Sequence, residues 1–131
     1  MSEGIIRIVL TSPVGQENVQ KIEAVSDRIC VAQVAPLVVA EKKGNFADKE
    51  KLTRLLQEAE VIYGWIHQFP KDLPERISHP KWIQVMSAGV DSLPEKILKS
   101  PIRIATVRGL HRTPMGEVVL EMMLMFVKDA P

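Results

Sequence analysis

DLPERISHPKWIQVM (residues 72–86) and SLPEKILKSPIRIATV (residues 92–107) are two consecutive versions of one local pattern. Each opens with a residue that can cap a helix, places proline in the first turn, and puts glutamate three residues after the cap. A second proline then ends the helix, and a β-branched strand follows at 82–86 or 102–107. Two copies are too few for a repeat array, so we interpret them as two helix–strand units with shared local chemistry.

The sequence before these units continues the same alternation. Helices are predicted at 16–25, where apolar residues recur three apart, and at 48–60, where leucines recur at helical spacing opposite a charged face. Residues 35–44 remain ambiguous, since they are extended in character and Pro36 opposes a continuing helix. Three further short apolar runs predict strands, at 5–10 (IIRIVL), 28–34 (RICVAQV) and 60–66 (EVIYGWI).

Five strands that alternate with helices predict an α/β fold with a parallel sheet and helices on both faces. In so short a chain this pattern favours a flavodoxin-like, doubly wound, five-stranded sheet. The length of 131 residues is enough for one domain with a real core. We therefore expect a single α/β domain over most of the chain.

Composition and charge exclude several classes of function. With 17 Lys and Arg against 16 Asp and Glu, the net charge of +1 gives no electrostatic basis for binding nucleic acid or an anionic membrane. Neither a signal peptide nor an apolar run of about 20 residues is visible, so we expect a cytoplasmic protein. Cys30 is the only cysteine, which excludes an intrachain disulfide and a cysteine-based metal site. Its apolar neighbours predict a buried thiol.

The segment 113–129 differs from the rest of the chain because it has almost no polar face. Thr113 can cap a helix and Pro114 suits its first position, so a helix apolar all round is predicted. It is either a core helix of this domain or a helix that covers an absent neighbour, and we favour the second interpretation. Without that neighbour we expect it to pair two copies of the chain in a homodimer, through Met122, Met123, Met125 and Phe126.

Ligands of doubly wound sheets bind beyond the carboxyl ends of the strands, so the loops after strands are the places to inspect. Residues 11–15 (TSPVG) are interpreted as a plain turn, because they match no phosphate-binding motif. His67 follows the third strand and could face a ligand. Residues 87–92 (SAGVDS) follow the fourth strand, where Gly89 tolerates a positive φ and successive backbone N–H groups before a helix could hold an anion. The alternative is that these residues only turn the chain and cap the next helix.

KWIQVMSAGVD at residues 81–91 and RGLHRTPMGE at residues 108–117 carry a resemblance to a known family. The chain resembles the D-isomer-specific 2-hydroxyacid dehydrogenases, which have a similar strand and SAGVD loop. Further along, these enzymes have a glycine and a Pro-x-x-Glu helix start, where the chain crosses into the nucleotide domain. The sequence departs from the family at Arg108, where members often have asparagine.

The resemblance implies that residues 1–112 form a flavodoxin-like substrate-binding domain and that residues 113–131 form the crossing helix toward an absent nucleotide-binding domain. It further implies that loop amides hold the carboxylate of a small 2-oxo or 2-hydroxy acid. The substrate-binding residues expected on this basis are Ser87, Ala88, Gly89, Val90 and His67.

The family's dinucleotide fingerprint and catalytic residues follow the crossing helix, and no GxGxxG occurs in these 131 residues. His67, His79 and His111 do not stand in the family's catalytic context. We therefore expect no catalytic, cofactor-binding or metal-binding residue here, and no dehydrogenase activity from the chain alone. NAD(P) is implied for the intact family protein.

Two alternatives remain: a free-standing flavodoxin-like binding module, and a non-catalytic assembly domain that uses the methionine-rich helix. A phosphate-receiver domain is disfavoured, because no acidic pair follows the first strand and no aspartate closes the third. A flavin module would need aromatic residues near a phosphate loop, whereas Tyr63 and Trp65 lie only near the third strand.

Overall fold

The computed structural model describes residues 4–78, 80–108 and 112–128. Its strands form one sheet in the order β2-β1-β3-β4-β5, and every neighbouring pair is parallel. This is the flavodoxin-like strand order, so the predicted fold class is confirmed. The strands are β1 (Ile6–Leu10), β2 (Ile29–Gln33), β3 (Val61–Gly64), β4 (Trp82–Val85) and β5 (Arg103–Ala105).

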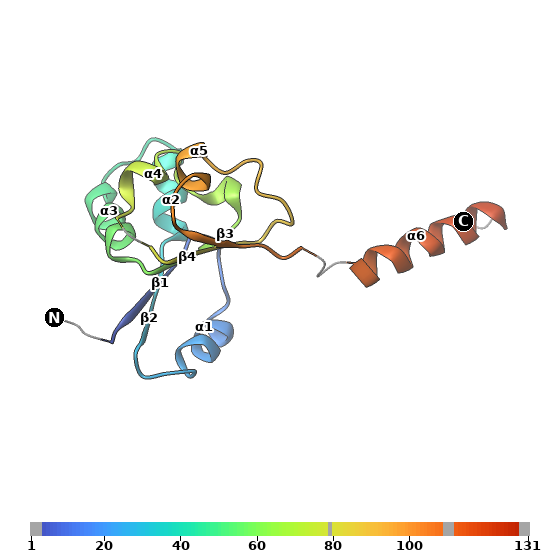
Figure 1. Cartoon of the computed structure of the whole chain (residues 1–131), viewed down its shortest axis with the longest axis horizontal. Helices are drawn as coiled ribbons and strands as arrows, with labels where there is room; N and C mark the ends of the chain where they lie inside the picture. Colours follow the sequence, from blue (N-terminus) through green and yellow to red (C-terminus); the bar gives the residue numbers. More distant parts are fainter. Residues whose placement is uncertain (1–3, 79, 109–111, 129–131) are drawn as a thin grey trace.

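Helices cover the two faces of the sheet unequally. Figure 1 shows α1 on one face and the other helices of the domain on the opposite face. A short 3-10 turn, η1 (Ile66–Gln68), follows β3. The helices are α1 (Gln16–Glu23), α2 (Ala35–Lys42), α3 (Lys49–Glu58), α4 (Leu73–Arg76) and α5 (Glu95–Leu98).

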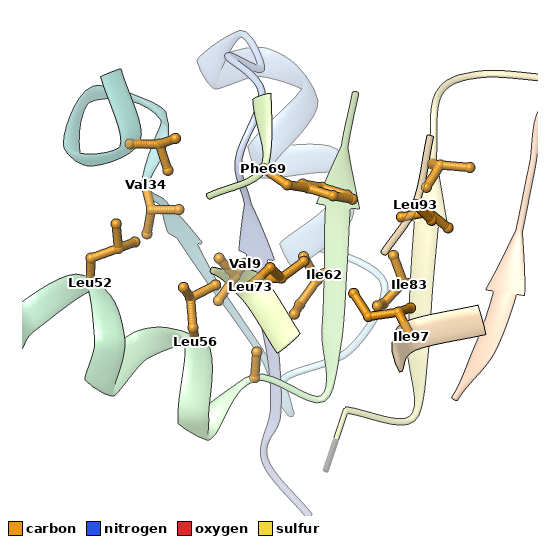
Figure 2. Close-up of a cluster of buried hydrophobic side chains, with 13 residues drawn as sticks. Val9, Val34, Leu52, Leu56, Ile62, Phe69, Leu73, Ile83, Leu93 and Ile97 are labelled. Carbon is orange, nitrogen blue, oxygen red and sulfur yellow. The ribbon is translucent and has the colours of Figure 1, made fainter. Parts of the chain in front are cut away.

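The core lies between the sheet and the helices α2 to α5. Val9, Ile62 and Ile83 lie side by side on adjacent strands and point to this layer, with at most 2% of each residue exposed. The leucines predicted at helical spacing in 48–60 supply Leu52 and Leu56, both fully buried (Figure 2). The core is completed by Val34, Val38, Ala59, Phe69, Leu73, Val85, Leu93 and Ile97.

The structure resolves one segment that the sequence left ambiguous and corrects two local expectations. Residues 35–42 form the helix α2, because Pro36 occupies its first turn, where a missing N–H costs nothing. Cys30 is exposed, since it lies on the edge strand β2. The helix expected after residue 92 begins only at Glu95, because a turn closed by Leu93 N–H on the Val90 carbonyl (3.0 Å) comes first.

The capping predicted for Asp72 and Ser92 is also wrong. Neither α4, which begins after Asp72, nor α5 has a side-chain hydrogen bond at its cap. The Asp72 carboxylate instead forms an ion pair with the Arg76 guanidinium at 3.5 Å, and it therefore does not cap the helix.

The last helix, α6 (Arg112–Val127), projects away from the domain (Figure 1). Its apolar residues are exposed, from 37% for Met125 to 88% for Phe126. The core-helix interpretation is therefore wrong, and the expected protruding apolar helix is present. No helix within the described residues is long and apolar enough to cross a membrane.

Candidate functional site

A cavity of about 460 Å³ lies beyond the carboxyl ends of β3 and β4, and it joins the two loops that the sequence singled out. Of the five predicted residues, His67, Ser87 and Gly89 line this cavity, whereas Ala88 and Val90 lie beside it in the same loop. Their role in binding remains a prediction. The complete lining is Trp65, Ile66, His67, Ser87, Gly89, Asp91 and Ser92.

The loop 87–92 is held at its ends and leaves its amides free. The Ser87 hydroxyl donates a hydrogen bond to the Gly89 carbonyl at 2.7 Å. Val107 N–H donates to the Ser87 carbonyl at 3.2 Å, which fixes the start of the loop against the residues after β5. Within the described part of the chain, no hydrogen bond involves the backbone N–H groups of residues 88–92. These donors are available to an anion.

Gly89 does not have the positive φ that the sequence analysis considered for it. The turn itself therefore does not require glycine. A Cβ at this position would meet no heavy atom within 4 Å, so what the missing side chain provides is open access to the backbone. Because α5 is only four residues long and starts at Glu95, the amides are a loop feature and not a helix N-terminus.

His67 is carried by η1, which lines the same cavity as the loop 87–92. Its imidazole lies 6.0 Å from the Trp65 ring, centroid to centroid, at a 39° tilt. The Lys42 ammonium donates a hydrogen bond to the His67 carbonyl and so ties η1 to α2. The His67 side chain is exposed.

Side chains of the loop after β1 form hydrogen bonds to the end of β3 and to η1, and they hold η1 in place. The Thr11 hydroxyl donates to the Tyr63 carbonyl at 3.0 Å, and Ser12 Oγ accepts the Trp65 N–H at 2.9 Å. Ser12 Oγ also donates to the Gln68 side chain. Thr11 and Ser12 are 1% and 5% exposed, so they are structural groups and not a phosphate cradle. The interpretation of 11–15 as a turn is thus supported.

Gly64 was missed by the sequence reasoning, although it determines how closely β3 approaches the loop after β1. A Cβ at Gly64 would lie 2.1 Å from Thr11 Oγ1 and 2.9 Å from Ser12 Oγ. Only glycine permits that approach. Trp65 was also missed as a lining residue. The signal available in the sequence was a tryptophan near the end of the predicted strand 60–66, two residues before His67.

A larger cavity of about 810 Å³ lies at the amino-terminal ends of β4 and β5, around Trp82 and Arg103. In a doubly wound sheet, ligands bind at the opposite edge, beyond the carboxyl ends of the strands. The smaller cavity is therefore the candidate site, because it combines that location with free amides. Within the residues described, no group of three His, Cys, Asp or Glu side chains could hold a metal ion.

Parts of the resembling motif cannot be placed. Gly109 and the histidines His79 and His111 lie outside the described residues. Arg108, the departure from the family, is exposed, and its N–H donates to Thr106 Oγ1 at 3.3 Å.

No family model and no curated protein matches the chain. Among solved structures, the chain is similar to the crystal structure of phosphoglycerate dehydrogenase from Lactobacillus plantarum, with 25% identity and a TM-score of 0.57. The match covers 93% of this chain and 35% of that enzyme, so the chain spans about a third of the enzyme's length. The chain is thus similar, over nearly its whole length, to part of a dehydrogenase.

Proposed function

We propose that the chain is the substrate-binding half of an NAD(P)-dependent D-2-hydroxyacid dehydrogenase. The observation that carries the proposal is one cavity lined by both η1 and the loop 87–92, which brings His67 together with the loop that has unbonded amides. The similarity to a phosphoglycerate dehydrogenase supports the reaction class. The sequence resemblance lies in the same loop.

The proposed ligand is a small 2-oxo or 2-hydroxy acid. Its carboxylate would accept hydrogen bonds from the N–H groups of Ala88, Gly89 and Val90, which need no cationic side chain to do this. The His67 imidazole would meet the oxygen on the second carbon. Asp91 also lines the cavity, and its charge opposes an anion. Binding by this half alone is therefore weak, ~1 mM or poorer.

A nicotinamide cofactor would supply the hydride to the intact enzyme. The described residues do not fit a dinucleotide, because the first βα loop turns Thr11 and Ser12 into the protein, where they bond to Tyr63 and Gln68. The 131 residues alone are expected to give no NADH oxidation with glyoxylate or pyruvate above the buffer rate.

An oxalate titration followed by amide shifts tests the site. We expect the shifts to cluster in residues 87–92 and at His67. Gly89→Asp places a negative charge where a side chain has open space, so it should abolish these shifts without unfolding the chain. Gly15→Asp is the matched control, because a Cβ there also meets nothing within 4 Å, and it should leave the titration unchanged. Shifts elsewhere with none in the loop would refute the proposed site.

We also propose that α6 pairs two copies of the chain, with Met122, Met123, Met125 and Phe126 in the contact. Each of these residues exposes more than a third of its surface. Burying a large apolar side chain stabilises by ~1.5–3 kcal/mol, and two-fold pairing buries the same patch on both chains.

Light scattering at tens of micromolar should give twice the 14.7 kDa mass of one chain. Phe126→Ser should shift the population toward monomer, whereas Val25→Ser should not, although Val25 is 77% exposed in the α1–β2 turn. A monomeric starting protein would exclude this pairing. A dimer that binds no oxalate would favour the assembly-domain alternative.

A further inference from the structure

A second cavity, of about 480 Å³, opens between α2, α3 and the segment before α4. Its walls include the apolar side chains of Val38, Phe46 and Pro70. Three lysines from three separate segments of the chain also line it: Lys42, Lys49 and Lys71. No residue lines both this cavity and the candidate substrate site, and the one direct link between them is the hydrogen bond from the Lys42 ammonium to the His67 carbonyl. Lys71 takes no part in that link, so its substitution tests this cavity separately.

The two carboxylates of the cavity are already bound by a buried arginine. Glu41 pairs with Arg76 through two hydrogen bonds of 2.7 and 2.9 Å, and Asp72 lies 3.5 Å from the same guanidinium. Arg76 is 4% exposed and also donates to Thr53 Oγ1 and the Lys49 carbonyl, at 2.9 and 3.1 Å. These two carboxylates exceed the single charge of Arg76 by one, so the three lysines leave the cavity region with a net charge of about +2.

The lysine charges have no counterion in the described part of the chain, where no carboxylate lies within 4 Å of the three ammonium groups. Lys49 Nζ lies 5.7 Å from the centre of the Phe46 ring. Partial burial, followed by repulsion from Lys71, holds the pKa of Lys42 below its usual value. An anion between these groups would remove that repulsion.

We propose that this cavity binds a phosphate monoester with a short carbon body. The three ammonium groups would hold the phosphate dianion, since lysine binds phosphate as a point charge and needs no fixed geometry. The apolar walls would cover the carbon atoms of the ester. The volume lies within the usual range for small-molecule sites.

The test is a titration with inorganic phosphate and with glycerol phosphate at constant ionic strength, followed by amide shifts. Saturable shifts are expected at residues 42–49 and 70–72, and the ester should bind more tightly than inorganic phosphate. Lys71→Gln should weaken binding about tenfold, while the oxalate response of the loop 87–92 stays unchanged.

Lys51→Gln is the matched control, because it removes the same charge from α3, two residues from Lys49, outside the cavity lining. It should leave the affinity for glycerol phosphate unchanged. Equal weakening by both variants would show only diffuse attraction to surface lysines and would overturn the proposal. The proposal also fails if shifts rise linearly with phosphate and never saturate.

Discussion

Arg76→Met is expected to lower the free energy of unfolding by about 3–5 kcal/mol, because it leaves a largely buried carboxylate without its partner. The guanidinium bonds to Glu41 in bidentate fashion, to Thr53 and to the Lys49 carbonyl, and it thereby joins α2, α3 and α4. The Arg76 and Glu41 side chains are 4% and 14% exposed. The hydrogen bonds that Arg76 donates to Glu41 raise the pKa of the guanidinium, so Arg76 keeps its positive charge.

Urea denaturation measures the free energy of unfolding of each variant. The slope of that free energy against urea concentration shows whether a variant also changes the unfolded state. Lys96→Met is the matched control, because its 2.9 Å pair with Glu75 is of similar length but is 75% and 55% exposed. It should cost far less than Arg76→Met, because water screens an exposed ion pair. The double variant Arg76→Met with Glu41→Leu should recover part of the loss, since no buried unpaired charge then remains and Asp72, which also loses its partner, is 51% exposed. Equal losses from Arg76→Met and Lys96→Met would contradict this account.

The order of elements could be predicted from sequence because it depends on local patterns. The repeated pattern at 72–86 and 92–107 and the leucine spacing in 48–60 identify helices and strands without tertiary information. The prediction that Cys30 is buried failed, because burial depends on the final position of a strand in the sheet. Cys30 has apolar neighbours, yet β2 forms an edge, and no local pattern says which strand that is.

The site could be predicted only in part for the same reason. The rule that ligands gather beyond strand ends selected the loops of His67 and Ser87, which do line one cavity. The groups that hold the elements around the site in place come from residues far apart in the sequence. Glu41 and Arg76 are 35 residues apart, and Ser12 reaches the turn at Trp65 across 53 residues. Such pairs depend on packing that one sequence does not reveal.

Gly64→Ala is expected to destabilise the chain by about 2–4 kcal/mol, the sum of overpacking and a strained or lost buried hydrogen bond. The new methyl group would lie 2.1 Å from Thr11 Oγ1, 2.9 Å from Ser12 Oγ and 3.3 Å from Phe69 Cε1. Neither hydroxyl can move away without losing a hydrogen bond, because the Thr11 hydroxyl donates to the Tyr63 carbonyl and Ser12 Oγ accepts the Trp65 N–H. The strand end that carries η1 must therefore shift.

Thermal and urea unfolding measure the loss, and Gly15→Ala provides the control, since a Cβ there meets nothing within 4 Å and should cost under about 0.5 kcal/mol. The cause can be separated from general strain with Thr11→Ala, which removes the nearest clashing atom. If the clash is responsible, Thr11→Ala and Gly64→Ala together cost at least about 1 kcal/mol less than the sum of the single variants. Strictly additive losses would show that Thr11 does not set the requirement for glycine. Because η1 carries His67, Gly64→Ala should also move the His67 amide resonance, which connects this packing contact to the candidate site.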